Sequence, residues 1–222
     1  MNIRAYLAEF IGTFALVFVG VMAMINLGTG PGALLGIALA HGLAIAVLVS
    51  ATAAISGGHL NPAVTLAIWM ARRIKIGDAL AYIVAQCLGA IVAAASVYQI
   101  MGYEALSQGT LVTRSMDPMP ALALEAIATF FLVFAVFGTA IDKRAPKVGG
   151  LYIGLSITMG ILAIGPITGA ALNPARWLGP ALIGKTEMQP MIYIAGPVLG
   201  ALVAALVYQY VMMGSDQIPE PE

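Results

Sequence analysis

Two copies of one short motif, each lying between long apolar segments, constrain this chain more than any other feature. Residues 56–63 read SGGHLNPA, and residues 168–175 read TGAALNPA. Asparagine is a favoured N-cap and proline a favoured first helical residue, so each copy predicts a helix that begins directly after its asparagine. The glycines before the asparagine permit an irregular backbone.

The composition shows where this irregular backbone lies, because the chain is 61% hydrophobic and only 9% charged. Soluble domains carry about 25% charged residues, so the composition indicates an integral membrane protein. Irregular backbone is tolerated at membrane depth only where it is packed in protein or lines a water-filled cavity. Two short helices with the same start signal at that depth therefore indicate a pore. Two ordinary capped helices would not explain why both lie at matching positions of the two halves.

Six apolar runs are long enough, or nearly so, to cross a hydrocarbon core of about 30 Å. They cover approximately residues 5–26, 33–55, 78–100, 119–140, 150–166 and 190–213, of which the fifth is short. The first run follows Arg4 at once and is longer than the apolar core of a cleaved signal peptide, so we expect a transmembrane helix there. The apolar stretches after Asn61 and Asn173 have only about ten residues, which suits re-entrant helices that cross half of the bilayer.

The basic residues between the spans predict the orientation of the chain. Arg114 and Lys185 fall on one side of the predicted spans, and we place Arg176 inside the protein. The basic residues on the other side are Arg4, Arg72, Arg73, Lys75, Lys143, Arg144 and Lys147. We therefore expect a multi-pass protein of the plasma (inner) membrane with both termini in the cytoplasm.

The two halves of the chain repeat. Glu9 and Glu125 each begin the pattern ExxxTFxLVF, and Tyr82 in a later span matches Tyr193. Three crossings per repeat is an odd number, so the second repeat is inverted, an architecture that brings discontinuous helices face to face at the midplane. The predicted fold is an all-α membrane protein with six transmembrane helices and two re-entrant half-helices, forming a single channel domain over 1–222 with inverted repeats at approximately 1–105 and 115–222.

Together these features resemble the aquaporin (major intrinsic protein) family over essentially the whole chain. The resemblance rests on the six spans, the two Asn-Pro-Ala motifs, a glutamate in the first span of each repeat, and Arg176 directly after the second motif. It implies a passive water channel that excludes ions and protons, with ammonia, urea or hydrogen peroxide as candidate further solutes. It also implies a homotetramer in the lipid bilayer and no cofactor. The compact length is similar to that of microbial water channels.

The midplane of the pore is expected at the two motifs. Each asparagine oxygen can accept from free backbone N–H groups of its own helix, which leaves the amide NH₂ as a donor into the pore. Two such donors can hold a water oxygen so that it does not also accept a proton, and both helix N-termini present positive partial charge that repels cations. The residues concerned are Asn61, Pro62, Ala63, Asn173, Pro174 and Ala175.

Backbone carbonyls before each motif are expected to form a track of hydrogen-bond acceptors. Those carbonyls belong to Gly57, Gly58, His59, Gly169, Ala170 and Ala171. His59 is expected to contribute its carbonyl and a structural side-chain contact rather than proton chemistry. Glu9 and Glu125 mark a proton relay or, in the interpretation that we favour, are buried carboxylates that accept from loop N–H groups and pin the re-entrant segments.

The resemblance also implies a narrow selectivity filter. Aquaporins build it from the arginine after the second motif, the residues three and twelve before that motif's asparagine, and the residue twenty before the first asparagine. Here these residues are Arg176, Ala170, Ile161 and His41. Strict water channels usually have Phe at the His41 position and His at the Ile161 position, whereas plant tonoplast intrinsic proteins have filters similar to this one. For His41 the alternative is a histidine that only packs between helices.

Other functions have less support from the sequence. Glycerol facilitators usually carry Asp where Trp177 stands and water channels usually carry Ser, so Trp177 departs from both branches. A structural membrane-junction protein is the alternative from a different class. The sequence holds no nucleophile–base pair and only the two histidines 41 and 59, so an enzyme is not expected. The single cysteine, Cys87, and the formal net charge of zero argue against a metal cluster and a nucleic-acid partner.

Overall fold

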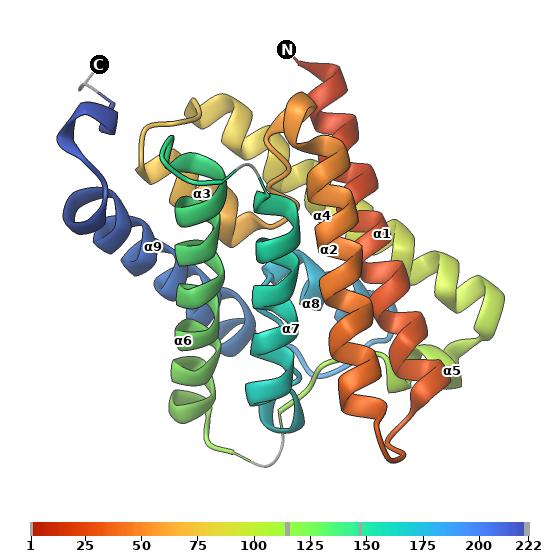
Figure 1. The fold of residues 1–222 in the computed structure, drawn as a ribbon. Helices are drawn as coiled ribbons and strands as arrows, with labels where there is room; N and C mark the ends of the chain where they lie inside the picture. Colours follow the sequence, from red (N-terminus) through yellow and green to blue (C-terminus); the bar gives the residue numbers. More distant parts are fainter. Residues whose placement is uncertain (1, 114–115, 147, 220–222) are drawn as a thin grey trace.

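The six membrane-length helices expected from the sequence are present in the computed structural model, which describes residues 2–113, 116–146 and 148–219 (Figure 1). Each helix differs from its predicted apolar run by no more than two residues at either end. They are α1 (Ile3–Leu27), α2 (Ala33–Ser56), α4 (Ile76–Met101), α6 (Pro118–Val136) with the π-helical end η1 (Phe137–Ile141), α7 (Gly149–Thr168), and a last span made of η2 (Met191–Ala195), α9 (Gly196–Val207) and η3 (Tyr208–Met212). The predicted all-α membrane fold is confirmed.

The two short helices begin at the two Asn-Pro-Ala motifs. They are α3 (Pro62–Met70), with 9 residues, and α8 (Pro174–Ile183), with 10 residues. At 1.5 Å rise per residue neither can cross a hydrocarbon core of about 30 Å, so both are half-spanning. Two further short elements, α5 (Tyr103–Gln108) and η4 (Ser215–Gln217), lie outside the spans.

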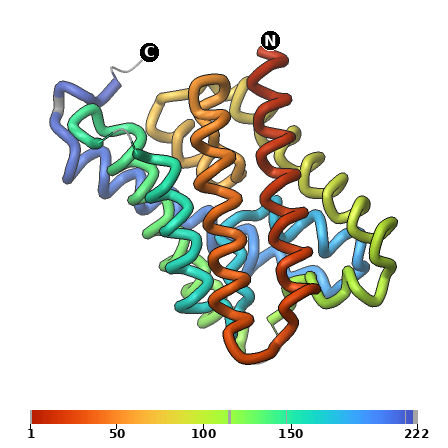
Figure 2. The backbone as a smooth tube through the Cα atoms, turned by 45° about the vertical axis from the view of Figure 1, so that its right-hand side comes forward, coloured from red at the N-terminus to blue at the C-terminus, as the bar shows by residue number. Residues whose placement is uncertain are grey.

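The contacts between helices follow the repeat. Helix α1 packs against α2 and α4, and its counterpart α6 packs in the same way against α7 and α9. Each short helix packs against the last span of the other half, α3 on α9 and α8 on α4. Both chain termini lie at the same end of the bundle (Figures 1 and 2). The two halves thus interlock through their short helices, while the sequence boundaries of the repeats stay a prediction.

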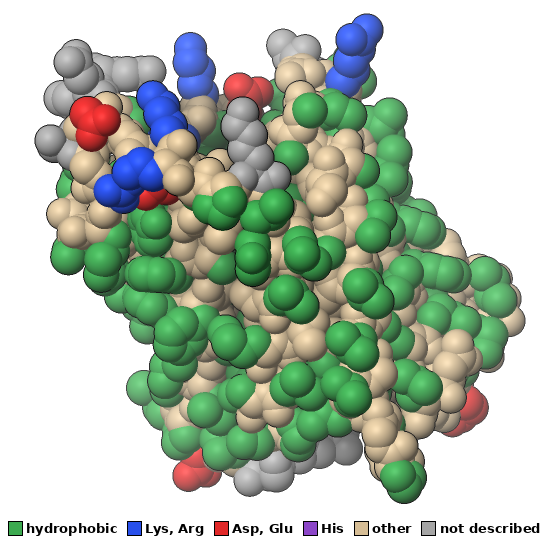
Figure 3. Space-filling model, in the orientation of Figure 1, with side chains coloured by type: hydrophobic (Ala, Val, Ile, Leu, Met, Phe, Trp, Pro, Cys, Tyr) green, Lys and Arg blue, Asp and Glu red, His purple; other side chains and the backbone are tan. Residues whose placement is uncertain are grey.

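The outer surface of the bundle is apolar along its flanks (Figure 3). On α4 the side chains of Leu80, Val84 and Leu88, spaced by four residues, are each at least half exposed. Such a stripe on one helix face would be unfavourable in water and is typical of a surface in contact with lipid. The multi-pass membrane protein expected from the sequence is confirmed.

Most basic residues lie at the end of the bundle that carries both termini, as the blue side chains in Figure 3 illustrate. We call this end the termini face. Lys185 follows α8 at the opposite end. The predicted positions of Arg114 and Lys147 lie outside the described residues. The basic residues described at the termini face are Arg4, Arg72, Arg73, Lys75, Lys143 and Arg144.

Close helix contacts depend on a pair of glycines at matching positions of the two repeats. A Cβ atom added to Gly89 of α4 would collide with the carbonyl oxygen of Phe10 in α1. A Cβ added to Gly200 of α9 would collide with the carbonyl oxygen of Ala126 in α6. Backbone cannot move aside as a flexible side chain can, so these glycines set the distance between the helices.

We expect Gly200→Ala to destabilise the bundle by about 1–3 kcal/mol, the usual cost of forcing an extra methyl group into a packed contact. The measurement is the thermal unfolding midpoint in a mild detergent. Gly77→Ala is the matched control, because Gly77 also lies in a helix but a Cβ there would meet nothing within 4 Å. An equal loss of stability in the two variants would contradict this account.

Candidate functional site

The two asparagines of the motifs are helix N-caps. Asn61 has extended backbone and its side-chain oxygen accepts from the N–H of Ala63 at 2.9 Å. Asn173 accepts from the N–H groups of Ala175 at 3.0 Å and Arg176 at 3.3 Å. A proline follows each asparagine as the first helical residue, where its missing N–H costs nothing. The local structure predicted for both motifs is thus present.

The amide nitrogens of the same two asparagines tie the two halves together. Asn61 Nδ2 donates to the carbonyl of Leu172 at 2.8 Å, and Asn173 Nδ2 donates to the carbonyl of Leu60 at 2.8 Å. From the sequence we expected the whole NH₂ group to face the pore. Instead one N–H of each amide joins the opposite loop, which leaves the second N–H of each as the donor toward the cavity that both residues line.

The loops before the asparagines hold non-glycine residues in left-handed backbone. Leu60 has φ 50°, Leu172 has φ 52° and Ala170 has φ 51°. Side chains rarely adopt this region, which costs roughly 1–2 kcal/mol per residue. These conformations aim successive carbonyls in one direction and persist because buried side chains hold the loops.

Two buried glutamates hold these loops in place. Glu9 accepts from the N–H groups of His59 at 2.9 Å and Leu60 at 2.6 Å, and from the Ser56 hydroxyl at 2.6 Å. A fourth bond comes from the Gln86 amide at 2.7 Å. Both oxygens of Glu9 are therefore occupied by donors of the first loop and of α4.

Glu125 does the same for the second loop. It accepts from the N–H groups of Ala171 and Leu172, both at 2.9 Å, and from the Thr168 hydroxyl at 2.7 Å. The carboxylates of Glu9 and Glu125 are 0% exposed. These contacts are those of carboxylates that pin the re-entrant segments, the interpretation favoured from the sequence.

Sequence reasoning missed a further pair of supports. Tyr82 donates its hydroxyl to the carbonyl of Ser56 at 2.9 Å, and Tyr193 donates to that of Thr168 at 2.7 Å. Ser56 and Thr168 are the last residues of α2 and α7, so each tyrosine holds the end of a span where the chain turns back toward the midplane. The repeat pairs these two tyrosines in the sequence, and buried polar groups at repeated positions are the signal that indicates such a role.

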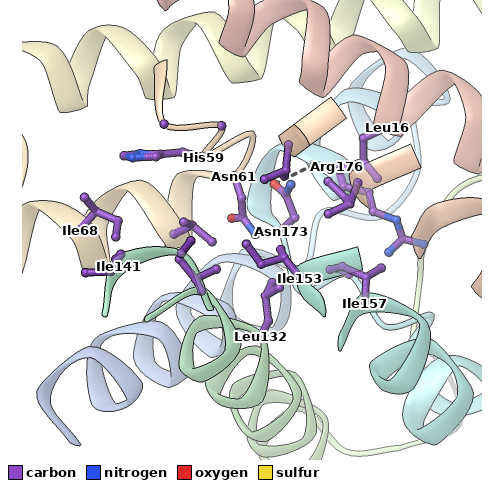
Figure 4. Close-up of a pocket in the computed structure, with 18 of the residues that line it drawn as sticks. Leu16, His59, Asn61, Ile68, Leu132, Ile141, Ile153, Ile157, Asn173 and Arg176 are labelled. Atoms are coloured by element: carbon purple, nitrogen blue, oxygen red, sulfur yellow. Dashed lines mark hydrogen bonds between the residues drawn. The ribbon is translucent and has the colours of Figure 1, made fainter. Parts of the chain in front are cut away.

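A cavity of about 180 Å³ lies where the two short helices meet (Figure 4). We call it the central cavity. Its polar wall includes Asn61, Asn173 and Arg176 together with the loop residues Gly57, Gly58, His59, Ala170 and Ala171. The opposite wall is apolar and includes Leu132, Ile153 and Ile157. Of the predicted acceptor track, only Gly169 is not among its lining residues.

The described residues offer no donor to the carbonyls of Gly57, Gly58 and His59, so these oxygens are free to accept from the contents of the cavity. The His59 ring also borders the cavity (Figure 4). Its Nδ1 lies 3.2 Å from the Thr65 hydroxyl, and its ring meets Tyr82 edge-on at 5.2 Å. A file of acceptors along one wall and an apolar surface opposite will orient a hydrogen-bonding solute while binding it weakly.

Arg176 lies at one end of the central cavity and is 6% exposed. Its Nη1 donates to the carbonyl of Ala170 at 2.6 Å and more weakly to that of Gly169 at 3.4 Å. Arg176 also borders a smaller cavity together with His41, Val17 and Leu111. Two of the predicted filter residues therefore face one space, and the third, Ala170, is bonded to Arg176.

The two remaining predicted filter residues differ in their surroundings, because His41 borders a cavity and Ile161 does not. His41 bonds through Nδ1 to the carbonyl of Ile37 at 2.8 Å, and its ring covers Gly20, where an added Cβ would collide with it. Ile161 is 2% exposed in the main apolar core and is not among the lining residues of either cavity. The filter role of Ile161 stays a prediction.

Trp177, which departs from both branches of the family pattern, is fully buried. Its ring stacks on Tyr193 with centroids 5.5 Å apart, and it packs among Leu111, Ala171 and Ile192. Trp177 is thus a packing residue of α8 that borders neither cavity.

Known proteins match this chain over nearly its full length. The family model of the major intrinsic proteins matches residues 1–208. The chain is 41% identical to the probable aquaporin TIP3-2 of Arabidopsis thaliana, over 98% of this chain and 87% of that one. It is 42% identical to the aquaporin AqpM of Methanothermobacter thermautotrophicus, over 92% of this chain and 95% of that one.

The fold matches as well. The solved structure of the aquaglyceroporin from Plasmodium falciparum is similar with a TM-score of 0.85 at 27% identity, over 96% of this chain and 97% of that one. These relatives carry the same arrangement from end to end rather than a shared fragment. The chain therefore belongs to the major intrinsic protein (aquaporin) family, whose members are membrane channels and not enzymes.

Proposed function

We propose that this chain is a passive channel for water that also passes small neutral solutes such as ammonia and urea, and that excludes ions and protons. One observation carries the proposal: the N-termini of two half-spanning helices meet at one cavity, each with a spare asparagine N–H. Each helix N-terminus is equivalent to roughly half a positive charge. Cations are repelled there, while a water molecule finds two donors and a file of carbonyl acceptors.

The same donors explain proton exclusion. A water held by Asn61 and Asn173 has both lone pairs occupied, so it cannot accept a proton from a neighbouring water. The hydrogen bonds between successive waters therefore point in opposite directions on the two sides of the midplane. The printed names of the relatives, aquaporins and an aquaglyceroporin, support a channel for water or small uncharged solutes.

Arg176, His41 and Ala170 form the proposed selectivity filter, with Ile161 as its fourth predicted member. Arg176 offers a fixed positive charge and further N–H donors that the described part of the chain leaves unpaired. His41 adds a polar ring in place of a large aromatic one. This combination favours a passage wider than that of a strict water channel, and glycerol is the solute that we expect to pass poorly.

We also propose a homotetramer in the plasma (inner) membrane, with one pore in each protomer and both termini in the cytoplasm. The basic residues of the termini face support this orientation through the positive-inside rule. The exposed apolar flanks offer surface both for lipid and for neighbouring protomers. Native mass measurement in mild detergent that finds only monomers would contradict the tetramer.

The experiment that tests the function is stopped-flow light scattering on reconstituted vesicles, with water, urea, glycerol and ammonia compared. We expect fast water flux with a low activation energy, measurable ammonia and urea flux, and little glycerol flux. Water permeability equal to that of protein-free vesicles would overturn the proposal. Glycerol flux as fast as water flux would instead assign the chain to the glycerol facilitators.

A further inference from the structure

One arginine at the termini face borders two spaces at once. Arg73 lines the central cavity, and it also lines an open groove of the termini face together with Trp69, Lys75 and Pro219. It is shared by both spaces, whereas the other lining residues of the groove do not reach the central cavity. Arg73 therefore stands at the boundary between the central cavity and the exterior, at the end away from Arg176.

The end of α3 fixes the backbone of Arg73 at this boundary. Arg72 takes left-handed backbone with φ 59°, and the N–H of Arg73 donates to the carbonyl of Ile68 at 3.1 Å. This is the geometry of a Schellman-type helix end, in which the chain reverses sharply. The guanidinium is only partly exposed, so its position depends on what it bonds.

Its partners come from the C-terminal segment, 140 residues or more further along the chain. Arg73 Nη2 donates to the carbonyl of Gln217 at 2.9 Å and to the Met213 sulfur at 3.2 Å. Arg73 Nε is buried and has no partner among the described residues. We call residues 213–217 the C-terminal clasp.

The clasp is itself fastened to the connection between α6 and α7. Gln217 accepts from the N–H of Lys143 at 2.9 Å and donates to the Asp142 carboxylate at 3.2 Å. Arg144 pairs with Asp142 at 2.5 Å and donates to the carbonyl of Met212 at 3.0 Å. Figure 2 shows the C-terminal segment beside this connection at the termini face.

The fastening persists over the neutral pH range. The hydrogen bonds of the Arg144 guanidinium and its backbone N–H hold the pKa of Asp142 well below its usual range. A carboxylate with a lowered pKa stays ionised unless the pH falls far below neutrality, so the pair with Arg144 remains intact. Separation of the clasp therefore requires a change in the segment itself rather than a modest change in pH.

We propose that the C-terminal clasp holds Arg73 across the mouth of the pore at the termini face, where Arg73 acts as a second cationic restriction opposite Arg176. This inference rests on the proposed function and adds a specificity-determining residue to it. Without the clasp the guanidinium loses both acceptors, and its long flexible stem lets it turn into the water of the groove. The mouth then widens, which favours urea over water.

The test compares Gln217→Ala, Arg73→Ala and the double variant in vesicles, with the ratio of urea to water permeability as the readout. Gln217→Ala removes the two side-chain bonds that join the clasp to Asp142 and Lys143 but keeps the length of the chain. We expect it to raise the ratio about twofold or more, the size typical of residues that share one hydrogen-bond network. The double variant should match Arg73→Ala alone, because the clasp acts only through Arg73.

Asp216→Ala is the matched control, since the neighbouring Asp216 side chain is exposed and makes none of these bonds. It should leave the ratio at the wild-type value. After the flux of protein-free vesicles is subtracted, the ratio does not depend on how much protein folds, so a mere loss of stability does not change it. An unchanged ratio in Gln217→Ala, or an equal rise in the presence and absence of the Arg73 side chain, would overturn the inference.

The failure of this inference and that of the proposed function can be told apart. If wild-type vesicles conduct no more water than protein-free ones, the proposed function fails. Hydrogen exchange of the Arg73 backbone amide then tests the clasp without any flux. Faster exchange in Gln217→Ala than in Asp216→Ala supports the contact between the clasp and the end of α3, and equal exchange in the two overturns it.

Discussion

Replacing Glu125 with alanine is expected to abolish water flux and to reduce the yield of folded protein. The carboxylate accepts from the N–H groups of Ala171 and Leu172 and from the Thr168 hydroxyl. Each buried donor left without a partner costs about 1–3 kcal/mol, so the total is several kcal/mol. That is a large part of the 5–15 kcal/mol by which proteins are typically stable.

The effect on flux is expected to exceed the effect on folding. Leu172 sits in left-handed backbone, and its carbonyl accepts from Asn61. When its N–H loses Glu125, the loop relaxes toward ordinary backbone, and that carbonyl turns away. The second loop then loses its link to the first motif, and both the acceptor track and the asparagine donors are displaced.

The measurement combines stopped-flow water flux with size-exclusion chromatography of the purified protein. Glu104→Ala is the control, because this glutamate lies on α5 at the opposite end of the bundle from the termini and its side chain is exposed. Glu125→Gln should fall between the two, since the amide keeps one acceptor oxygen but turns an NH₂ toward donors. Water flux in Glu125→Ala equal to that of wild type would show that the loop does not need this carboxylate.

The spans and both re-entrant helices were predictable because their signals are local. Apolar length predicts a crossing, and an Asn-Pro pair predicts a helix start, whatever the rest of the chain does. The hydrogen bond between Asn61 and Leu172 was not predictable in the same way. It joins residues more than a hundred positions apart, and its existence depends on left-handed backbone at leucine, which no propensity favours.

The four residues counted from the motifs for the proposed filter differ in how far local structure fixes their positions. Arg176 and Ala170 lie within a few residues of Asn173, so a single capped loop fixes their positions, and they bond to each other. His41 and Ile161 lie on α2 and α7, where the facing side depends on how those helices are rotated. His41 borders the smaller cavity beside Arg176, whereas Ile161 is buried in an apolar cluster and borders neither cavity. The rotation of a helix about its axis is set by packing, so it cannot be derived by counting a fixed number of residues back from a motif.

The proposed role of Arg73 was also not predictable from the sequence. In the sequence it is one of several basic residues at the predicted cytoplasmic face, with nothing to separate it from Arg72 or Lys75. Only the folded chain brings residues 213–217 beside Arg73 and bonds them to the connection after α6. Long-range contacts of this kind arise from the arrangement of the helices, and no local pattern encodes them.

Replacing Arg176 with valine is expected to have the largest effect on selectivity. The change removes a positive charge from one end of the cavity and frees the carbonyls of Ala170 and Gly169, to which the guanidinium donates. Urea N–H groups can then bond to those carbonyls in a wider passage. We expect urea flux to rise about tenfold, which corresponds to a barrier lower by roughly 1.4 kcal/mol, and a proton leak to become measurable.

The measurements are urea flux by light scattering and proton flux with a pH-sensitive dye trapped in vesicles. Arg4→Val is the matched control, because Arg4 is exposed at the start of α1 and borders neither cavity. It should change neither flux. If Arg176→Val also leaves both fluxes at the wild-type level, then Arg176 does not restrict the pore.

Arg176→Lys separates charge from width in the same assay. Lysine keeps the positive charge but is a point donor without the planar fork that spans the carbonyls of Ala170 and Gly169. If charge excludes protons while bulk excludes urea, this variant blocks protons as wild type does and passes urea at a rate between those of wild type and Arg176→Val. A proton leak as large as that of the valine variant would mean that the placement of the guanidinium, rather than its charge alone, sets the barrier. The two asparagine donors would then be insufficient without it.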